Sequence, residues 1–288
     1  MSQRKFLILG ANGQVGTELQ RSLAGAGELI ACDRKTADLS QPEELRNLVQ
    51  KIRPDVILNA AAYTAVDRAE SEPELAMTVN GVAPGVLAEE AEKLNAWLIH
   101  YSTDYVFDGA KKSPWLENDA PNPLNVYGKT KLAGERAIQQ AGGKYLIFRT
   151  SWVYGPHGRN FLLTMLRLGK EREQLRIVDD QFGAPTSSIA IADATRDVLE
   201  KASSSGLYHL TCQGETSWCG FAQAIFDRYK SADYKAPQVI PIPSSEYPTP
   251  ARRPTNSVLS GEKLRADFGV VLPSWPESLD QVLGSLRN

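Results

Sequence analysis

Cysteine is scarce in this chain. Its 288 residues include three cysteines, Cys32, Cys212 and Cys219. Their spacing matches no metal site, and their small odd number argues against a disulfide framework. We therefore expect three buried, reduced thiols in a cytoplasmic protein.

The chain also lacks an excess of charge and any long apolar run. Lysine and arginine number 32 and aspartate and glutamate 34, so the net charge is −2. Nucleic-acid binding needs a concentrated basic surface, and this balance argues against such a partner. No apolar stretch is long enough to cross a bilayer, and we find no signal-peptide pattern, internal repeat or low-complexity tail. No membrane partner is expected, and the 42% hydrophobic content suffices for a substantial core.

What the chain does contain is an alternation of strand-like and helix-like segments. This alternation predicts a doubly wound parallel sheet with right-handed crossovers, a Rossmann-like α/β fold. Strands are predicted at residues 5–10, 28–33, 56–59, 97–102 and 145–149, with helices between them that include 42–51, 74–94 and 126–140.

After about residue 150 the loops become richer in proline and polar residues. Helices are predicted at 161–168, 189–201 and 221–229, with a short strand at 207–210. We expect residues 1–150 to form one domain and 151–288 to form mainly a smaller α/β lobe, with room for the chain to cross back. Because ligands of open α/β sheets bind at the carboxyl edge, this lobe should supply the substrate half of a cleft.

A glycine-rich turn follows the first predicted strand. At such a strand–turn–helix junction, glycines permit a tight turn and let the backbone approach a pyrophosphate at the helix N-terminus. The spacing is G-x-x-G-x-x-G, and the flanking strand and helix favour a dinucleotide site over an ordinary turn. The predicted cofactor-binding residues here are Gly10, Asn12, Gly13, Gln14, Val15 and Gly16.

The end of the second strand bears on the choice of cofactor. Asp33 lies about 20 residues past the glycines, where an acid usually takes the adenosine ribose hydroxyls of NAD. Arg34 follows, and an arginine there either holds the 2′-phosphate of NADP or is a solvated loop charge. The choice between NADH and NADPH therefore stays open.

Two further segments are candidates for the cofactor wall. Asp38 and Leu39 are placed to read an adenine edge, although Ser40-x-x-Glu43 also has the pattern of a helix capping box. Ala60-Ala61-Ala62 follows a strand, and its small residues either let the backbone approach a ligand or form a close packing contact.

Tyr127 and Lys131 are four residues apart and so share one face of a predicted helix. The lysine cation favours the phenolate and is expected to lower the pKa of Tyr127 from about 10 toward neutrality. Such a tyrosine can exchange a proton with a carbonyl or an alcohol near pH 7. Thr103 follows the strand 97–102, so its hydroxyl should face the same cleft. Asn80 is mid-helix, where it is either exposed or buried and hydrogen-bonded near Lys131.

Together these features resemble the extended short-chain dehydrogenase/reductase family. The resemblance runs nearly end to end, and several of its motifs carry no chemistry in the superfamily at large, which points to one branch acting on a deoxysugar nucleotide. The motifs are HYSTDYVF at 100–107, PLNVYG at 123–128, RTSWVY at 149–154, DQFGAPT at 180–186 and YPTPARRP at 247–254.

The resemblance implies an NAD(P)H-dependent reduction of the C4 keto group of dTDP-4-dehydro-6-deoxy-L-mannose (dTDP-4-keto-L-rhamnose), serving cell-surface polysaccharide such as O-antigen. Tyr127 is then the proton donor, Lys131 tunes it and holds the nicotinamide ribose, and Thr103 hydrogen-bonds the reacting oxygen. Trp152 either closes the sugar pocket or is a core residue, and one of two arginines is expected on the diphosphate. The implied substrate-binding residues are Thr103, Asp104, Tyr127, Trp152, Asn160, Arg252 and Arg253.

Some relatives in this branch dimerise around magnesium held by carboxylates. The matching positions here are Ile189 and Ser285, which are not useful magnesium ligands. We therefore expect no metal requirement and a monomer or weak homodimer. Two alternatives stay open, namely another nucleotide-sugar ketoreductase or epimerase, and a non-catalytic NADP-binding regulatory subunit.

Overall fold

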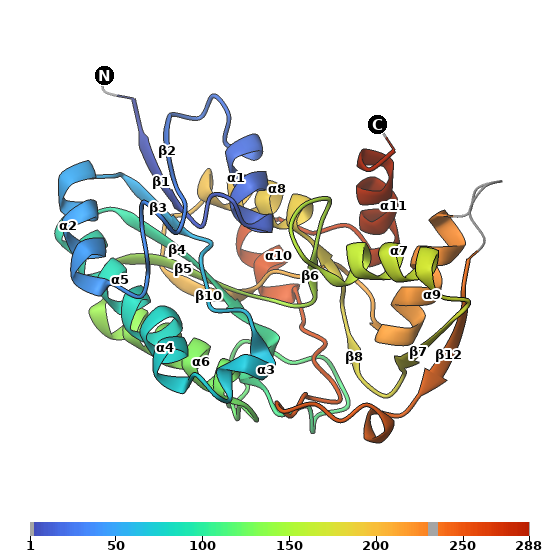
Figure 1. The fold of residues 1–288 in the computed structure, drawn as a ribbon. Helices are drawn as coiled ribbons and strands as arrows, with labels where there is room; N and C mark the ends of the chain where they lie inside the picture. The colour runs from blue at the N-terminus through green and yellow to red at the C-terminus, as the bar shows by residue number, and fades with distance from the viewer. Residues whose placement is uncertain (1–2, 230–235, 288) are drawn as a thin grey trace.

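A six-stranded parallel sheet forms the centre of the first half of the molecule (Figure 1). The computed structural model describes residues 3–229 and 236–287, and the strand order is β10-β5-β4-β3-β1-β2. This confirms the predicted fold class. The order reverses between β1 and β3, the switch point at which open α/β sheets bind ligands. The strands are β1 (Lys5–Leu9), β2 (Glu28–Cys32), β3 (Val56–Asn59), β4 (Trp97–Thr103), β5 (Lys144–Thr150) and β10 (Gly206–His209).

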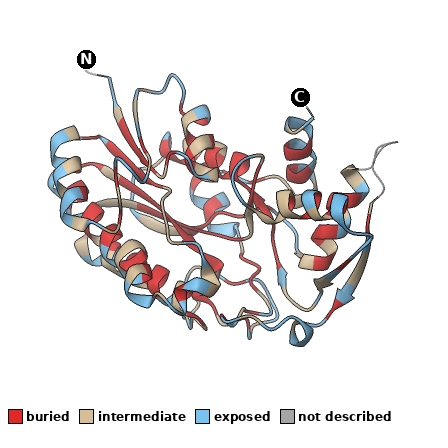
Figure 2. Ribbon diagram, viewed as in Figure 1, coloured by how far each residue is buried: buried red, intermediate tan, exposed pale blue. Residues whose placement is uncertain are grey.

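Helices cover both faces of this sheet. Successive residues of β1 point to opposite faces, so Phe6 and Ile8 join one core cluster while Leu7 and Leu9 join the other. Figure 2 shows the buried strands between helices whose outer sides are exposed. One face carries α1 (Gln14–Ser22) and α8 (Ser188–Leu199), and the other carries α2 (Pro42–Ile52), α5 (Ala83–Lys93) and α6 (Val126–Ala141).

Two elements predicted in the second lobe return to the first sheet. β10 pairs with β5 in parallel, and α8 packs against α1. The reason is burial, because β5 would otherwise be an open edge. The division near residue 150 is therefore crossed by the chain, as the sequence allowed.

The helix predicted over 74–94 is divided into three parts. α4 (Pro73–Met77) leads into a π-helical segment, η1 (Thr78–Val82), and then into α5. Pro84 has no N–H to donate to the carbonyl of Asn80, which disturbs the α-helical hydrogen-bond ladder at this point. The helical periodicity of the sequence was confirmed, but the segment before the proline is a π-helix and not an α-helix.

The second lobe has a core of its own. Phe221 and Phe226 pack with Leu279, Val282 and Leu283 of the last helix. The apolar positions of the C-terminal helix thus pack on their own lobe. Its main elements are α7 (Phe161–Glu171), α9 (Trp218–Tyr229), α11 (Trp275–Ser285) and the parallel pair β7 (Gln174–Val178) and β12 (Gln238–Ile242).

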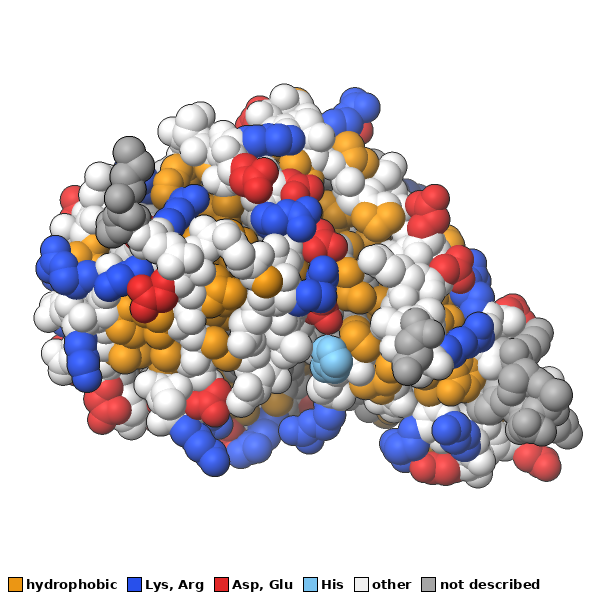
Figure 3. Space-filling model, turned by 90° about the horizontal axis from the view of Figure 1, so that it is seen from above, with side chains coloured by type: hydrophobic (Ala, Val, Ile, Leu, Met, Phe, Trp, Pro, Cys, Tyr) orange, Lys and Arg blue, Asp and Glu red, His pale blue; other side chains and the backbone are white. Residues whose placement is uncertain are grey.

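Positive and negative side chains are interspersed on the face shown in Figure 3. Within residues 3–229 and 236–287, no helix combines the length and apolarity needed to span a membrane.

Short elements connect the larger helices and strands. They are α3 (Val66–Ala69), η2 (Asp104–Val106), β6 (Val153–Tyr154), β8 (Phe182–Gly183), β9 (Thr186–Ser187), β11 (Thr216–Ser217), η3 (Ser244–Glu246) and α10 (Glu262–Phe268).

Candidate active site

The glycine turn lies between β1 and α1, as predicted. Gly10 has φ 77°, and a Cβ there would lie 2.8 Å from the backbone nitrogen of Ala61. A Cβ on Gly16 would lie 2.1 Å from the carbonyl oxygen of Gly10. These two positions accept only glycine, because the turn packs directly against its own backbone and against the end of β3. Gly13 is the N-cap of α1 and brings no side chain over the helix N-terminus.

A cavity of about 650 Å³ opens over this turn. It runs along the carboxyl ends of β1, β2 and β3 to α6. Of the predicted cofactor-binding residues, Gly16 alone is not among those that line it, since it packs inside the turn. The predicted residues in the lining are Gly10, Asn12, Gly13, Gln14, Val15, Asp33, Arg34, Asp38, Leu39, Ala60, Ala61, Ala62, Tyr127 and Lys131.

Tyr127 and Lys131 line the same cavity from α6, so the spacing did place both side chains on one side of the helix. The helix begins well because the Asn125 side chain accepts a hydrogen bond from the Gly128 N–H at 2.8 Å. Thr103 ends β4 close by; its hydroxyl donates to Asp104 Oδ1 at 2.9 Å and accepts the Tyr105 N–H at 3.1 Å, and it lies near enough to Tyr127 to affect the pKa of that residue. The three residues that were predicted as catalytic are therefore brought together.

We expected the pKa of Tyr127 to be lowered, and this expectation is wrong, because the protein raises it. Removal from water raises the pKa of Tyr127 to about 12, and the nearby Thr103 hydroxyl acts in the opposite direction. Lys131 is 1% exposed and donates to the Tyr101 carbonyl at 2.6 Å, on β4. Burial lowers the pKa of Lys131 to about 8, against the effect of the Glu135 charge. The Lys131 ammonium is thus held by a backbone carbonyl of β4.

The sequence of the chain matches a known family. A family model described as the RmlD substrate binding domain matches residues 4–288. The chain belongs to this family. It is 52% identical over 283 residues to a dTDP-4-dehydrorhamnose reductase of Burkholderia thailandensis, covering 94% of this chain and 95% of that protein. It is 50% identical over 291 residues to the dTDP-4-dehydrorhamnose reductase of Escherichia coli K12, covering 98% of this chain and 97% of that protein.

Solved structures share this fold. A Bacillus anthracis dTDP-4-dehydrorhamnose reductase in complex with NADP has a TM-score of 0.93 at 37% identity, over 99% of this chain and 100% of that one. A Thermus thermophilus UDP-glucose 4-epimerase complexed with NAD has a TM-score of 0.82 at 21% identity, over 99% of both chains, and shows the fold alone. The predicted resemblance to extended short-chain dehydrogenase/reductases is confirmed.

Asp33 and Arg34 are neighbours in the cavity lining, just after β2. The Asp33 carboxylate accepts the Asn12 amide at 3.2 Å, and its hydrogen bond from Thr36 lowers its pKa. The Arg34 side chain is 79% exposed, with a loose 3.4 Å contact to Asp38. Both residues line the cavity, and the cofactor preference stays a prediction.

The alternative reading of residues 38–43 as a capping box is wrong. The N-cap of α2 is Gln41, which makes no side-chain cap, and Pro42 opens the helix. Asp38 instead accepts the Ser40 N–H at 2.9 Å, which lowers its pKa. Asp38 thereby fixes the loop that lines this end of the cavity.

Asn80 is buried, and its amide is bonded to neighbouring backbone, as one of the two readings predicted. Its Oδ1 accepts the Tyr63 N–H at 2.9 Å, and its Nδ2 donates to the Tyr63 carbonyl at 3.0 Å and to Thr130 at 3.3 Å. Thr130 precedes Lys131, so Asn80 joins η1 and the 60–63 loop to α6.

Trp152 occupies the junction between the lobes in a strained conformation. Its φ is 48°, and its ring stacks on Trp218 with the centroids 3.5 Å apart and an interplanar angle of 4°. No local pattern in the sequence indicated Trp218, because the two rings meet only through tertiary packing. Asp104 is 2% exposed, and burial raises its pKa to about 6.

The residues predicted for the nucleotide end are placed differently from one another. Arg253 forms an ion pair with Asp67 at 2.8 Å, whereas the side chain of Arg252 is exposed. Asn160 caps α7 by accepting the Leu163 N–H, and its amide donates to Gln14 Oε1 at 2.9 Å. Asn160 therefore ties the glycine turn to the second lobe. Its predicted contact with phosphate, like that of Arg252, stays a prediction.

Ile189 and Ser285, which stand at the positions where some relatives hold magnesium, make contacts within the protein itself. Ile189 is 8% exposed within the second-lobe core, and the Ser285 hydroxyl donates to the Val282 carbonyl of its own helix. Three or more metal-ligating side chains do not gather anywhere in the described part of the chain.

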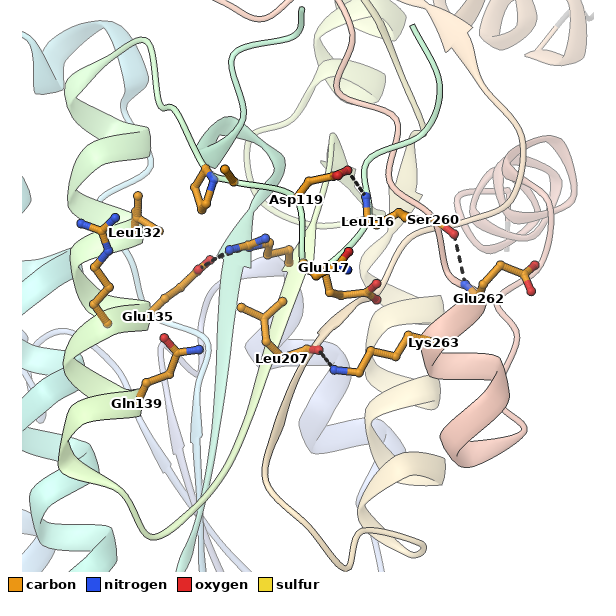
Figure 4. A pocket seen from close by; sticks show the side chains of 15 residues that line it. Leu116, Glu117, Asp119, Leu132, Glu135, Gln139, Leu207, Ser260, Glu262 and Lys263 are labelled. Carbon is orange, nitrogen blue, oxygen red and sulfur yellow. Dashed lines mark hydrogen bonds and ion pairs between the residues drawn. The ribbon is translucent and has the colours of Figure 1, made fainter. Parts of the chain in front are cut away.

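A second cavity, of about 740 Å³, opens beside another face of α6 (Figure 4). Glu135 and Arg149 form a buried ion pair in its wall, and Lys263 donates to the Leu207 carbonyl across it. Tyr127, Lys131 and the glycine turn all line the first cavity. The larger volume of the second cavity therefore does not mark it as the candidate active site. The sequence reading missed the Glu135–Arg149 pair, although a Glu four residues after Lys131 was a usable signal.

Proposed function

We propose that this protein is an NAD(P)H-dependent dTDP-4-dehydrorhamnose reductase. The observation that carries the proposal is the shared cavity, in which a bare glycine turn and the pair Tyr127 and Lys131 face one another, with Thr103 next to them. The substrate assignment rests on the high identity to curated reductases of that name.

The residues present fit a dinucleotide. The turn at Gly10 and Gly13 presents backbone without side chains at the N-terminus of α1, where a pyrophosphate is favoured. Asp33 or Arg34 would hold the adenosine ribose, and Lys131 the nicotinamide ribose. When bound, NAD(P)H supplies the hydride that reduces the C4 carbonyl.

Tyr127 supplies the proton. With a pKa near 12 it is protonated at neutral pH, which is the form that a reduction needs at the start. We propose that Thr103 hydrogen-bonds the same oxygen, where negative charge grows in the transition state. The charged Lys131 stabilises the phenolate that Tyr127 becomes after it has given up its proton.

We assign the substrate half to the second lobe. Arg253 is already paired with Asp67, so Arg252 is the arginine proposed to meet the diphosphate. Trp152, stacked on Trp218, is proposed to close the sugar pocket from the lobe junction. We further propose a cytoplasmic monomer or weak homodimer with no nucleic-acid or membrane partner.

One assay separates the candidate functions. The pure protein is mixed with dTDP-4-keto-L-rhamnose and either NADPH or NADH, while absorbance at 340 nm and the sugar product are followed. Stoichiometric cofactor oxidation with formation of dTDP-L-rhamnose is expected. Sugar isomerisation without net cofactor oxidation would identify an epimerase. Cofactor binding without turnover of this or other 4-keto sugar nucleotides would identify a regulatory subunit.

A further inference from the structure

A buried row of polar side chains stands behind Lys131. Asn59 on β3, His100 on β4 and Lys131 on α6 are each 1% exposed. Asn59 and His100 are register partners in the sheet, and the Asn59 amide lies 3.1 Å from His100 Nδ1. On the other side of the ring, His100 Nε2 lies 3.1 Å from Lys131 Nζ. Three elements therefore meet through one imidazole.

The chemistry of Lys131 fixes the tautomer of His100. A charged ammonium can only donate, so Nε2 must carry a lone pair and Nδ1 must carry the proton. Nδ1–H then needs an acceptor, and the Asn59 amide oxygen can provide it. Oδ1 of Asn59 is buried and has no hydrogen-bond partner as placed, so exchanging the two ends of the amide gives the Nδ1 proton its acceptor.

The same contacts fix the direction of the remaining Lys131 proton. An ammonium has three N–H donors, and two are used by the Tyr101 carbonyl and His100 Nε2, both on β4. Lys131 also lines the cavity that Tyr127 lines. The third donor is therefore left for the cavity side.

We propose that His100, oriented by Asn59, is a positioning residue that anchors the Lys131 ammonium and leaves one of its protons facing Tyr127. This rests on the proposed function only in giving that proton a catalytic use; the anchoring itself is a property of the protein alone.

A neutral acceptor suits this place better than a carboxylate would. Burial first, and then the Lys131 charge, hold the pKa of His100 well below its usual value, so the ring stays neutral near pH 7. A carboxylate in contact with the ammonium would neutralise much of its charge and draw it away from Tyr127. Other ionisable groups also surround this site. They include Glu135, Lys129 and Arg136 on α6 itself, Arg149 on β5 paired with Glu135, Asp104 after β4, Tyr105, whose ring contacts that of Tyr127, and Glu70, which accepts the Val126 N–H at the helix start.

Two substitutions at His100 separate anchoring from packing. Glutamine can place an acceptor where Nε2 stands, whereas asparagine can reach only the place of Nδ1. The pKa of Lys131 is measured in the cofactor-free protein by NMR titration of lysine labelled with ¹³C at Cε, with the signal assigned by Lys131→Met. His100→Asn should lower that pKa, near 8 in the parent, by about one to two pH units, because an acceptor of the charged form is lost. His100→Gln should restore most of it.

Turnover gives the second readout. In His100→Asn the loss of kcat at high pH should begin about one to two pH units lower than in the parent, with His100→Gln close to the parent. His209→Asn is the matched control, since His209 is equally buried and lies outside the Lys131 contacts. If His100→Asn folds poorly, Asn59→Leu should lower the pKa of Lys131 in the same direction by removing the acceptor for Nδ1–H.

The outcomes are distinct. An unchanged Lys131 pKa in His100→Asn or, should that variant not fold, in Asn59→Leu overturns the inference, as do equal shifts in the Gln and Asn variants or a matching shift in His209→Asn. A parent protein that fails to reduce the 4-keto sugar nucleotide overturns the proposed function instead, and the NMR titration then still tests the anchoring.

Discussion

At the scale of single residues, the site is built from side chains whose ordinary chemistry is changed by burial. Tyr127 is a weaker acid than free tyrosine, and Lys131 is a weaker base than free lysine. Both shifts come chiefly from removal from water. The spacing of the two residues gave their common direction, but only the packing around them gave their charge states.

Replacing Tyr127 by phenylalanine should remove the proton donor and little else. We expect kcat to fall by about 10²- to 10⁴-fold, the usual worth of general acid catalysis. NADPH affinity, measured by fluorescence titration, should stay near that of the parent. Tyr145→Phe is a suitable control, because Tyr145 packs against the core beneath α2 and α5. Near-normal turnover in Tyr127→Phe would show that another group is the acid.

Arg34→Ala tests the choice of cofactor. If Arg34 contacts the 2′-phosphate, its loss should weaken NADPH by about 1–3 kcal/mol and leave NADH nearly unaffected. Dissociation constants for both cofactors measure this difference. Lys51→Ala, an exposed cation on α2, controls for the general loss of positive charge. An equal change for the two cofactors would rule out a 2′-phosphate contact.

At the scale of elements, α6 depends on how closely it approaches η1. A Cβ on Gly134 would lie 2.2 Å from the Asn80 carbonyl oxygen, so the two backbones touch at this point. Asn80 then reaches Thr130 one turn earlier. The π-helical winding and the glycine together decide where Tyr127 and Lys131 stand.

Gly134→Ala should therefore destabilise the protein although alanine is the better helix former. Overpacking of this kind typically costs about 1–3 kcal/mol, and urea unfolding at pH 7 measures it. Gly284→Ala in α11 is the matched control. A Cβ there meets nothing within 4 Å, so alanine should raise stability by about 0.5–1 kcal/mol. A stabilising effect of both substitutions would mean that α6 can move away from η1 at no cost.

At the scale of the whole molecule, two buried neutral histidines link stability to pH. Burial is the main reason that the pKa of His209 falls to about 3, and it also lowers the pKa of His100. The unfolded chain binds protons on these rings from about pH 6.5 downward while the folded chain does not, so stability is lost as pH falls below 6.5. Asp104, whose raised pKa near 6 favours the folded state as pH falls through the same range, opposes this in part.

The free energy of unfolding in urea should thus fall between pH 7 and pH 5. His209→Gln should show a smaller fall than the parent, because one of the two proton-linked groups is gone. Gly284→Ala, which removes no titratable group, should leave the slope unchanged. A parallel pH dependence in the parent and His209→Gln would show that His209 is not kept neutral by folding.

Assembly and metal dependence are tested together. With Ile189 and Ser285 in place of acids, turnover and oligomeric state should not respond to magnesium. Light scattering and activity are measured with EDTA and again after magnesium is added. A dimer that dissociates in EDTA and re-forms with magnesium would show that other ligands hold the metal.

The sequence by itself determined the features that depend only on residues close to one another in the chain. The apolar strand, the glycine turn and the following helix each carry local signals, and the four-residue spacing put Tyr127 and Lys131 on one side of α6. Parallel strands that read as continuous apolar runs gave the sheet, and the motifs gave the family.

Only the tertiary structure decided what depends on neighbours distant in the chain. β10 and α8 return to the first sheet because edges and faces need cover, Trp152 finds Trp218 across the lobe junction, and Arg253 finds Asp67. The contact of His100 with Lys131 joins a strand and a helix 31 residues apart. Burial sets the pKa values of the site, and burial is a property of the packed molecule that no local pattern contains.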